Sequence, residues 1–149
     1  MSTQKLSSKD VPTQEVILID STGAEVPGLI IPTGATSVQA SSGNVAAAVA
    51  AAALPAVSGK TNYLSGFKIT GAGSTSGLPV TVTITGLLGG TASYTYTFAT
   101  GVTVGNQPLI VDFDPPLPAS AVNTAITVSC PSGGTGNTNN TTHAHGYVK

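Results

Sequence analysis

The sequence predicts an all-β fold, a single antiparallel β-sandwich or barrel, on three observations. Apolar and polar residues alternate with a period of two over several segments in the second half of the chain. Turn clusters rich in Gly, Pro, Ser and Asn separate these segments at intervals of roughly 8–12 residues. The 149 residues also suffice for one domain and hardly for two, since domains cluster near ~100–150 residues.

The first residues differ from the rest. Residues 1–14 mix Ser, Thr, Gln and Lys without periodicity and predict a flexible N-terminal arm, so the β-sandwich domain is expected over residues 15–149. Inside it, residues 16–19 (VILI) predict a short strand that ends at the turn signal DSTG. Residues 26–31 are expected to return as its hairpin partner.

The alanine-rich run at residues 45–57 is the ambiguous segment. Alanine is the best helix former, and Val45, Val49 and Ala53 follow the i, i+4 spacing of a helix face. However, Gly43 precedes the run and Pro55 lies near its end, which leaves little length for a stable helix. Strand and helix both stay open for residues 45–54, and the favoured interpretation is an extended strand whose small side chains let a neighbour approach closely.

Alternation is strongest from residue 61 onward. The VTVTIT segment at residues 80–85 directs Val and Ile inward and the threonines outward. In the first strand of this half, Tyr63, Phe67 and Ile69 are expected on one face. A hairpin turn follows residue 87, where Gly89 and Gly90 can supply positive φ angles. The strands expected here cover residues 61–69, 80–85, 92–98, 109–113, 125–130 and 143–148.

Charge is scarce in this chain. Only 7% of residues are charged, where about 25% is usual, and the five cationic residues are all lysines. This excludes nucleic-acid binding by phosphate neutralisation, which needs clustered Lys and Arg. No charge occurs in residues 26–59 or 69–111. The surface is either coated with hydrated Ser and Thr hydroxyls or covered by other subunits, and the second is favoured because interface cores are depleted of charge.

Cysteine usage and hydropathy give further expectations. The single cysteine, Cys130, excludes an intramolecular disulfide and is expected as a small buried hydrophobe on a strand. The polar N-terminus lacks the apolar core of a secretory signal. The longest apolar run has 13 residues, whereas a membrane-spanning helix needs ~20. A soluble intracellular product without membrane contact is therefore expected.

Catalytic motifs are missing from the sequence. Gly59-Lys60-Thr61 lacks the preceding glycine of a phosphate-binding loop and opens a strand instead of a helix. Asp112 and Asp114 share one strand face, whereas a glycosidase places its two carboxylates across a cleft. They are interpreted as a solvated strand edge. No nucleophile beside a base and no cofactor loop is visible, so the chain is predicted not to be an enzyme and to hold no cofactor.

Two further groups are weighed as binding residues. His143 and His145 share a strand face and can grip one metal ion, but a catalytic zinc needs a third protein ligand. No metal is therefore assigned, although three copies meeting at an axis could assemble a histidine ring. Tyr63, Tyr94 and Tyr96 could form a sugar-stacking platform, although aromatic residues in such positions are more often core.

Several segments together resemble the jelly-roll cement, or decoration, proteins of tailed bacteriophages, over roughly residues 40–149. The segments are turns and strand ends and carry no active site. They are GKTNYLSGF at 59–67, VTITGLLGGT at 82–91, PLPAS at 116–120, NTAI at 123–126, GNTN at 136–139 and AHGY at 144–147.

The resemblance implies a jelly roll that binds the outside of an assembled virion capsid after synthesis in the host cytoplasm. Its implied partners are the major capsid protein and further copies of the chain, as a homodimer or homotrimer. The arm lies outside the resemblance; that it orders on binding and attaches to a neighbour is a hypothesis from its disorder-like composition and stays open. Its candidate capsid or subunit contacts are Lys5, Leu6, Lys9 and Val11.

Two other functions remain open. A fibre or spike head that recognises a cell-surface glycan would be present in a few copies per particle, whereas a cement protein would be present in hundreds. A hydrolase using Asp112 and Asp114 is the third alternative, which the residues favour least.

Overall fold

The structure is a computed structural model that describes residues 31–149, except residues 33, 76 and 102–104. The arm at residues 1–14 with its candidate contacts, the strand expected at residues 16–19 and nearly all of its expected partner at 26–31 lie outside the described residues. The part from Ile31 to Lys149 is one compact unit. Its elements are β1 (Thr36–Ser41), β2 (Ala50–Leu54), β3 (Asn62–Ala72), β4 (Pro79–Leu87), β5 (Gly90–Thr97), β6 (Leu109–Pro118), β7 (Ile126–Cys130) and β8 (Asn139–Val148).

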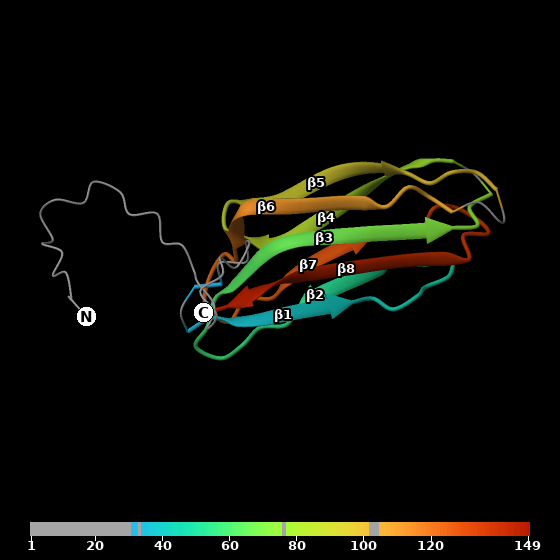
Figure 1. Cartoon of the computed structure of the whole chain (residues 1–149). Helices are drawn as coiled ribbons and strands as arrows, with labels where there is room; N and C mark the ends of the chain where they lie inside the picture. The colour runs from blue at the N-terminus through green and yellow to red at the C-terminus, as the bar shows by residue number, and fades with distance from the viewer. Residues whose placement is uncertain (1–30, 33, 76, 102–104) are drawn as a thin grey trace, which may run out of the picture. The chain divides into compact units, whose positions relative to one another are not determined.

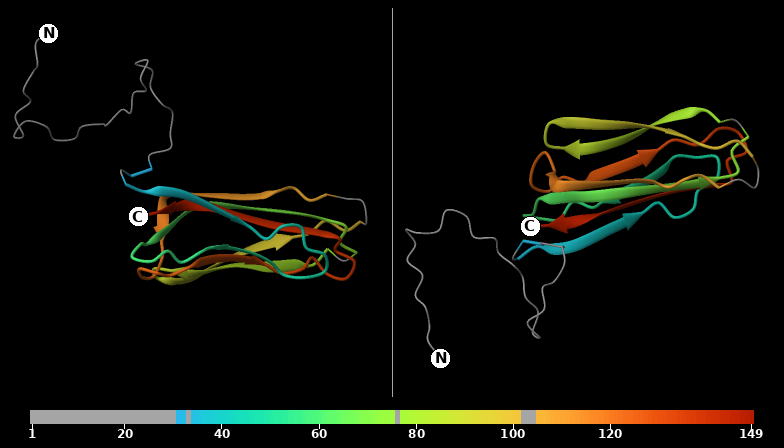
Figure 2. Two further views of the ribbon diagram at one scale, coloured as in Figure 1. Left: turned by 90° about the horizontal axis from the view of Figure 1, so that it is seen from below. Right: turned by 45° about the horizontal axis from the view of Figure 1, so that its top comes forward.

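The eight strands form two four-stranded antiparallel sheets, in the orders β1-β8-β3-β6 and β2-β7-β4-β5 (Figure 1). Four of the pairings are nested like a folded ribbon, namely β1 with β8, β2 with β7, β3 with β6 and β4 with β5. This connectivity is that of a jelly roll, and the sheets lie face to face as a sandwich (Figure 2). The predicted fold class is confirmed.

The described part of the chain contains strands, turns and bends but no helix, and therefore no helix capable of crossing a membrane.

The alanine-rich run forms strand β2, as the favoured interpretation predicted, but only over Ala50–Leu54. Ala50, Ala52 and Leu54 are buried against the other sheet, whereas the two residues between them are exposed. The strand pairs residue by residue with β7. Strand pairing and burial thus outweigh the helix propensity of alanine, because a five-residue helix would form few backbone hydrogen bonds of its own.

The strands differ from the expected ones in occurrence, in limits and in faces. Strand β1 was not predicted, because Val38 and Ala40 are its only apolar residues. Strand β6 does not end at Phe113 but continues through three prolines to Pro118, which an edge strand tolerates. Tyr63 does not share a face with Phe67 and Ile69, because a β-bulge between Leu64 and Gly66 reverses the alternation.

The core fills the space between the sheets with side chains that alternate inward along each strand. Phe67, Phe98 and Ile84 are fully buried in it. Tyr94 contacts Phe67 edge-on at a centroid distance of 5.4 Å, and Tyr96 contacts Phe98 at 5.1 Å. Tyr94, Tyr96 and Phe98 therefore all point inward, as alternation along the strand expected at residues 92–98 requires.

Buried asparagines hold the loops at both ends of the sandwich. The Asn62 side-chain amide donates hydrogen bonds to the carbonyl oxygens of Pro55 (2.9 Å) and Thr124 (2.8 Å), which joins two loops to β3. The Asn140 amide donates to Pro131 O at 3.1 Å in the same way. These bonds fix the loops relative to the sheets, so the outer faces of the sandwich are presented on a well-packed support.

Candidate functional site

The two outer faces of the sandwich differ in their chemistry. The strands β2, β7, β4 and β5 contain no Asp, Glu, Lys, Arg or His. Their outward side chains are small hydroxyl or methyl groups, and we call this surface the uncharged face. It consists of Ala51, Ala53, Thr81, Thr83, Thr85, Ser93, Thr95, Thr97, Thr127 and Ser129.

The uncharged face follows directly from the alternating sequence. Threonine favours strands because its branched Cβ fits the pleated surface. The inward Val and Ile residues of β4 leave the threonines pointing outward, as predicted for residues 80–85. One row across the sheet consists of Ala51, Ser129, Thr83 and Ser93. The small side chains in this row give a surface without large projections.

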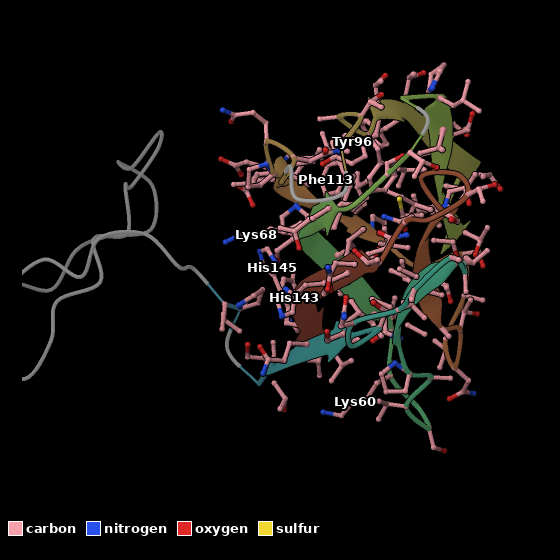
Figure 3. All side chains as sticks on the ribbon, turned by 90° about the vertical axis from the view of Figure 1, so that its right-hand side faces the viewer. Lys60, Lys68, Tyr96, Phe113, His143 and His145 are labelled. Carbon is pink, nitrogen blue, oxygen red and sulfur yellow. The ribbon has the colours of Figure 1, made fainter. Side chains whose placement is uncertain are left out.

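The outer face of the sheet β1-β8-β3-β6 carries charged and titratable groups, and we call it the charged face. Lys68, His143 and His145 project from this side of the sandwich (Figure 3). The other members are Asp112 and Asp114 on the edge strand β6. Apart from Lys60 in a loop and Lys149 at the C-terminus, they account for every charged side chain in the described residues.

His145 and Asp112 meet across a glycine. Gly66 lies between them in the register, and the distance from His145 Nε2 to Asp112 Oδ1 is 3.8 Å. A Cβ at position 66 would lie 2.6 Å from Asp112 Oδ1 and 2.9 Å from His145 Cε1, so only glycine leaves room for the pair. Partial burial lowers the pKa of His145. The Asp112 carboxylate opposes this shift, and His143 and Lys68 add to it.

The two histidines point to different partners. His143 Nε2 lies 3.4 Å from Gln39 Oε1 on β1, whereas His145 faces Asp112 on β6. Their ring centroids are 6.1 Å apart. Within residues 31–149, as far as these are described, no three His, Cys, Asp or Glu side chains form a group that could hold a metal ion. A histidine ring built from three copies stays a prediction.

The remaining sequence candidates are dispersed. Asp112 and Asp114 share one face of β6, as expected, and the Asp112 side chain is 71% exposed. Cys130 is buried, as predicted, and burial raises its pKa to about 11, so its thiol is a poor nucleophile. Lys60 lies in the loop between β2 and β3, ahead of a strand and not of a helix.

The three tyrosines considered as a sugar platform are not brought together. Tyr63 lies outward on β3 and stacks on Tyr147 at a centroid distance of 4.8 Å. Tyr94 and Tyr96 belong to the other sheet and pack inward. The sequence did not reveal the Tyr63–Tyr147 contact, because it depends on the pairing of β3 with β8.

Comparison of the chain with known protein families, curated proteins and solved structures finds no match to a family model, a curated protein or a solved structure.

The pKa of His145 predicts a pH dependence of stability. Because the pKa is lowered from 6.5 in the folded chain, the unfolded chain binds this proton at higher pH. Stability is therefore expected to decrease as the pH falls below about 6.5. Urea unfolding between about pH 5 and 8 should show this decrease in the wild-type chain and a flatter profile in the His145→Gln variant. Parallel profiles for the two chains would contradict the assignment to His145.

Proposed function

We propose that the chain is a structural protein of a virion, a cement or decoration protein that binds the outer surface of a tailed-bacteriophage capsid. The observation that carries the proposal is the uncharged face, a whole sheet surface of small hydroxyl and methyl groups on a rigid sandwich. Charged residues are depleted in the cores of protein interfaces, since a charge buried without a partner is costly.

The division of charge between the faces supports a directed attachment. The uncharged face can be buried against a partner without removing water from any charged group. Its hydroxyl groups can donate hydrogen bonds to the partner's backbone and accept hydrogen bonds from it. The charged face with Lys68, Asp112 and Asp114 remains in water on the outside. The proposed partner is the major capsid protein. Many identical contacts on a symmetric shell would hold each copy more firmly than one contact alone.

The proposal assigns no catalysis, cofactor or nucleic-acid contact to the chain. It retains the arm at residues 1–14, with Lys5, Leu6, Lys9 and Val11, as a second contact to the capsid or to a neighbouring subunit. Deletion of the arm without loss of capsid affinity would remove this part of the proposal and leave the uncharged face as the attachment surface.

The test is the sedimentation of the tagged chain recovered from the cells in which it is produced during infection or induction. We expect it to travel with megadalton particles, at a copy number in the hundreds and close to that of the most abundant particle protein. Recovery only as a small free species would contradict the proposal. A few copies per particle together with measurable sugar binding would favour the alternative of a glycan-binding fibre or spike.

A further inference from the structure

Within the described residues, one edge of strand β5 pairs with no other strand, and we call it the free edge. Among the described strands, β5 pairs with β4 alone, on its other edge, and its eight residues contain no charge and no proline. Natural sheets usually protect such edges with charged side chains, prolines or bulges. The neighbouring edge strand β6 has this protection, in Asp112, Asp114 and three prolines. Strands β1 and β2, at the other side of the sandwich, are shorter and pack against each other.

The register identifies the backbone groups that point away from β4. Thr97 lies opposite Pro79, which has no N–H, so the hydrogen-bonded pairs between these strands begin with Val80 and Tyr96 and continue at every second residue. The N–H and C=O groups of Thr91, Ser93 and Thr95 therefore point to the free edge. The Asn106 side-chain amide donates to Thr97 O at 3.2 Å, which confirms the direction and covers the end of the edge.

The core is also incompletely closed at the β5 side. Tyr96 and Phe113, from the two sheets, lie at this side of the sandwich (Figure 3). They belong to a set of partly exposed core side chains that we call the open seam. The open seam consists of Tyr94, Tyr96, Leu109, Val111 and Phe113. A second sheet can pair with the free edge and at the same time cover the partly exposed apolar side chains of the open seam.

We propose that two copies of the chain pair through their β5 edges, antiparallel and about a two-fold axis at Ser93, into one continuous eight-stranded sheet. Two-fold pairing places the edge against the same edge of the second copy, so an edge of one charge sign would repel itself, and β5 has no charge. Thr91 and Thr95 then pair across the axis, and the three pairs exchange about six hydrogen bonds.

The inward side chains fit this register. A two-fold axis at position 93 places Tyr94 opposite Ala92 of the second copy and Tyr96 opposite Gly90. Each large ring thus faces a residue with a small side chain or none, which leaves space for the open seams of both copies to cover each other. The sequence left a homodimer and a homotrimer open, and this pairing predicts the homodimer. It does not rest on the proposed function, because it needs no capsid.

Sedimentation velocity of the full chain over about a hundredfold range of concentration tests the inference. We expect the wild-type chain at twice its monomer mass of 14.6 kDa. Ser93→Pro removes the N–H that faces the free edge and keeps the hydrogen bonds to β4. The dissociation constant of the dimer should therefore rise by at least about tenfold. The control Ser93→Thr should remain dimeric. A monomeric or trimeric wild type, or an unchanged Ser93→Pro dimer, would overturn the inference.

If Ser93→Pro fails to fold, chemical cross-linking tests the pairing of the two β5 strands instead. A short bis-maleimide should join two copies of Ser93→Cys, whose Cα atoms are expected about 5.5 Å apart. It should not join Thr81→Cys, which lies exposed on the same face but one strand inward. The native Cys130 is buried and does not compete. Equal cross-linking of both variants would overturn the inference, whereas capsid binding by a monomer would leave the proposed function intact.

Discussion

The Gly146→Ala variant is expected to lose most or all of its folded population. Gly146 lies on β8, which pairs with both β1 and β3 at the centre of its sheet. A Cβ there would overlap the carbonyl oxygen of Tyr63 and lie 2.9 Å from its carbonyl carbon and 3.2 Å from Leu64 Cα. All three are backbone atoms, so no side-chain rotation relieves the overlap and the strands must separate. We expect a loss of about 3 kcal/mol or more in the free energy of unfolding.

Urea unfolding followed by circular dichroism measures this effect. Gly105→Ala is the matched control, because a Cβ at that position meets no atom within 4 Å. The control should unfold at nearly the wild-type urea concentration. If Gly146→Ala unfolded at the same urea midpoint as the control, β3 and β8 would not approach each other closely at Gly146, and the prediction would be wrong.

Thr83→Lys is expected to abolish capsid binding while leaving the fold intact. Thr83 lies in the central row of the uncharged face, between Ser129 and Ser93. An ammonium group introduced there would be buried against the capsid without a partner, at a cost of about 3 kcal/mol or more. This cost corresponds to a capsid affinity weakened by at least about 100-fold. Titration of purified, undecorated capsids with the labelled chain gives the affinity.

The same substitution on the other sheet serves as the control. Thr70 is exposed on the outer side of β3, on the charged face. Thr70→Lys adds the same group to the chain, so it changes net charge and solubility equally, and it should bind capsids like the wild-type chain. Equal binding by the two variants would exclude the uncharged face as the contact surface.

The strands with regular alternation could be predicted because their signal is local. In the VTVTIT segment each residue's face follows from its position, and β4 forms there as expected. The same reasoning failed at Tyr63, since a bulge that reverses the alternation leaves no mark in the residues before it. Strand β1 was missed because its formation depends on β8, a hundred residues later in the chain, and not on its own composition.

The chemistry of the faces depends still more on long-range pairing. Alternation predicted that the threonines point outward. That the four uncharged strands lie in one sheet follows only from the strand order β2-β7-β4-β5. The contact of His145 with Asp112 needs two strands to flank Gly66 on β3. The free edge of β5 follows from the same strand order, and the backbone groups that face it follow from the register with Pro79. Composition therefore predicted that charge-poor surface exists, and the topology determined where it lies.

Electron cryomicroscopy of capsids decorated with the wild-type chain tests most directly whether the uncharged face binds the capsid. We expect the sheet β2-β7-β4-β5 to face the shell, with Thr83 and Ser129 in the contact and with Lys68, His143 and His145 in solvent. Density that places the sheet β1-β8-β3-β6 against the shell, or capsids that carry no added density, would contradict the proposed attachment.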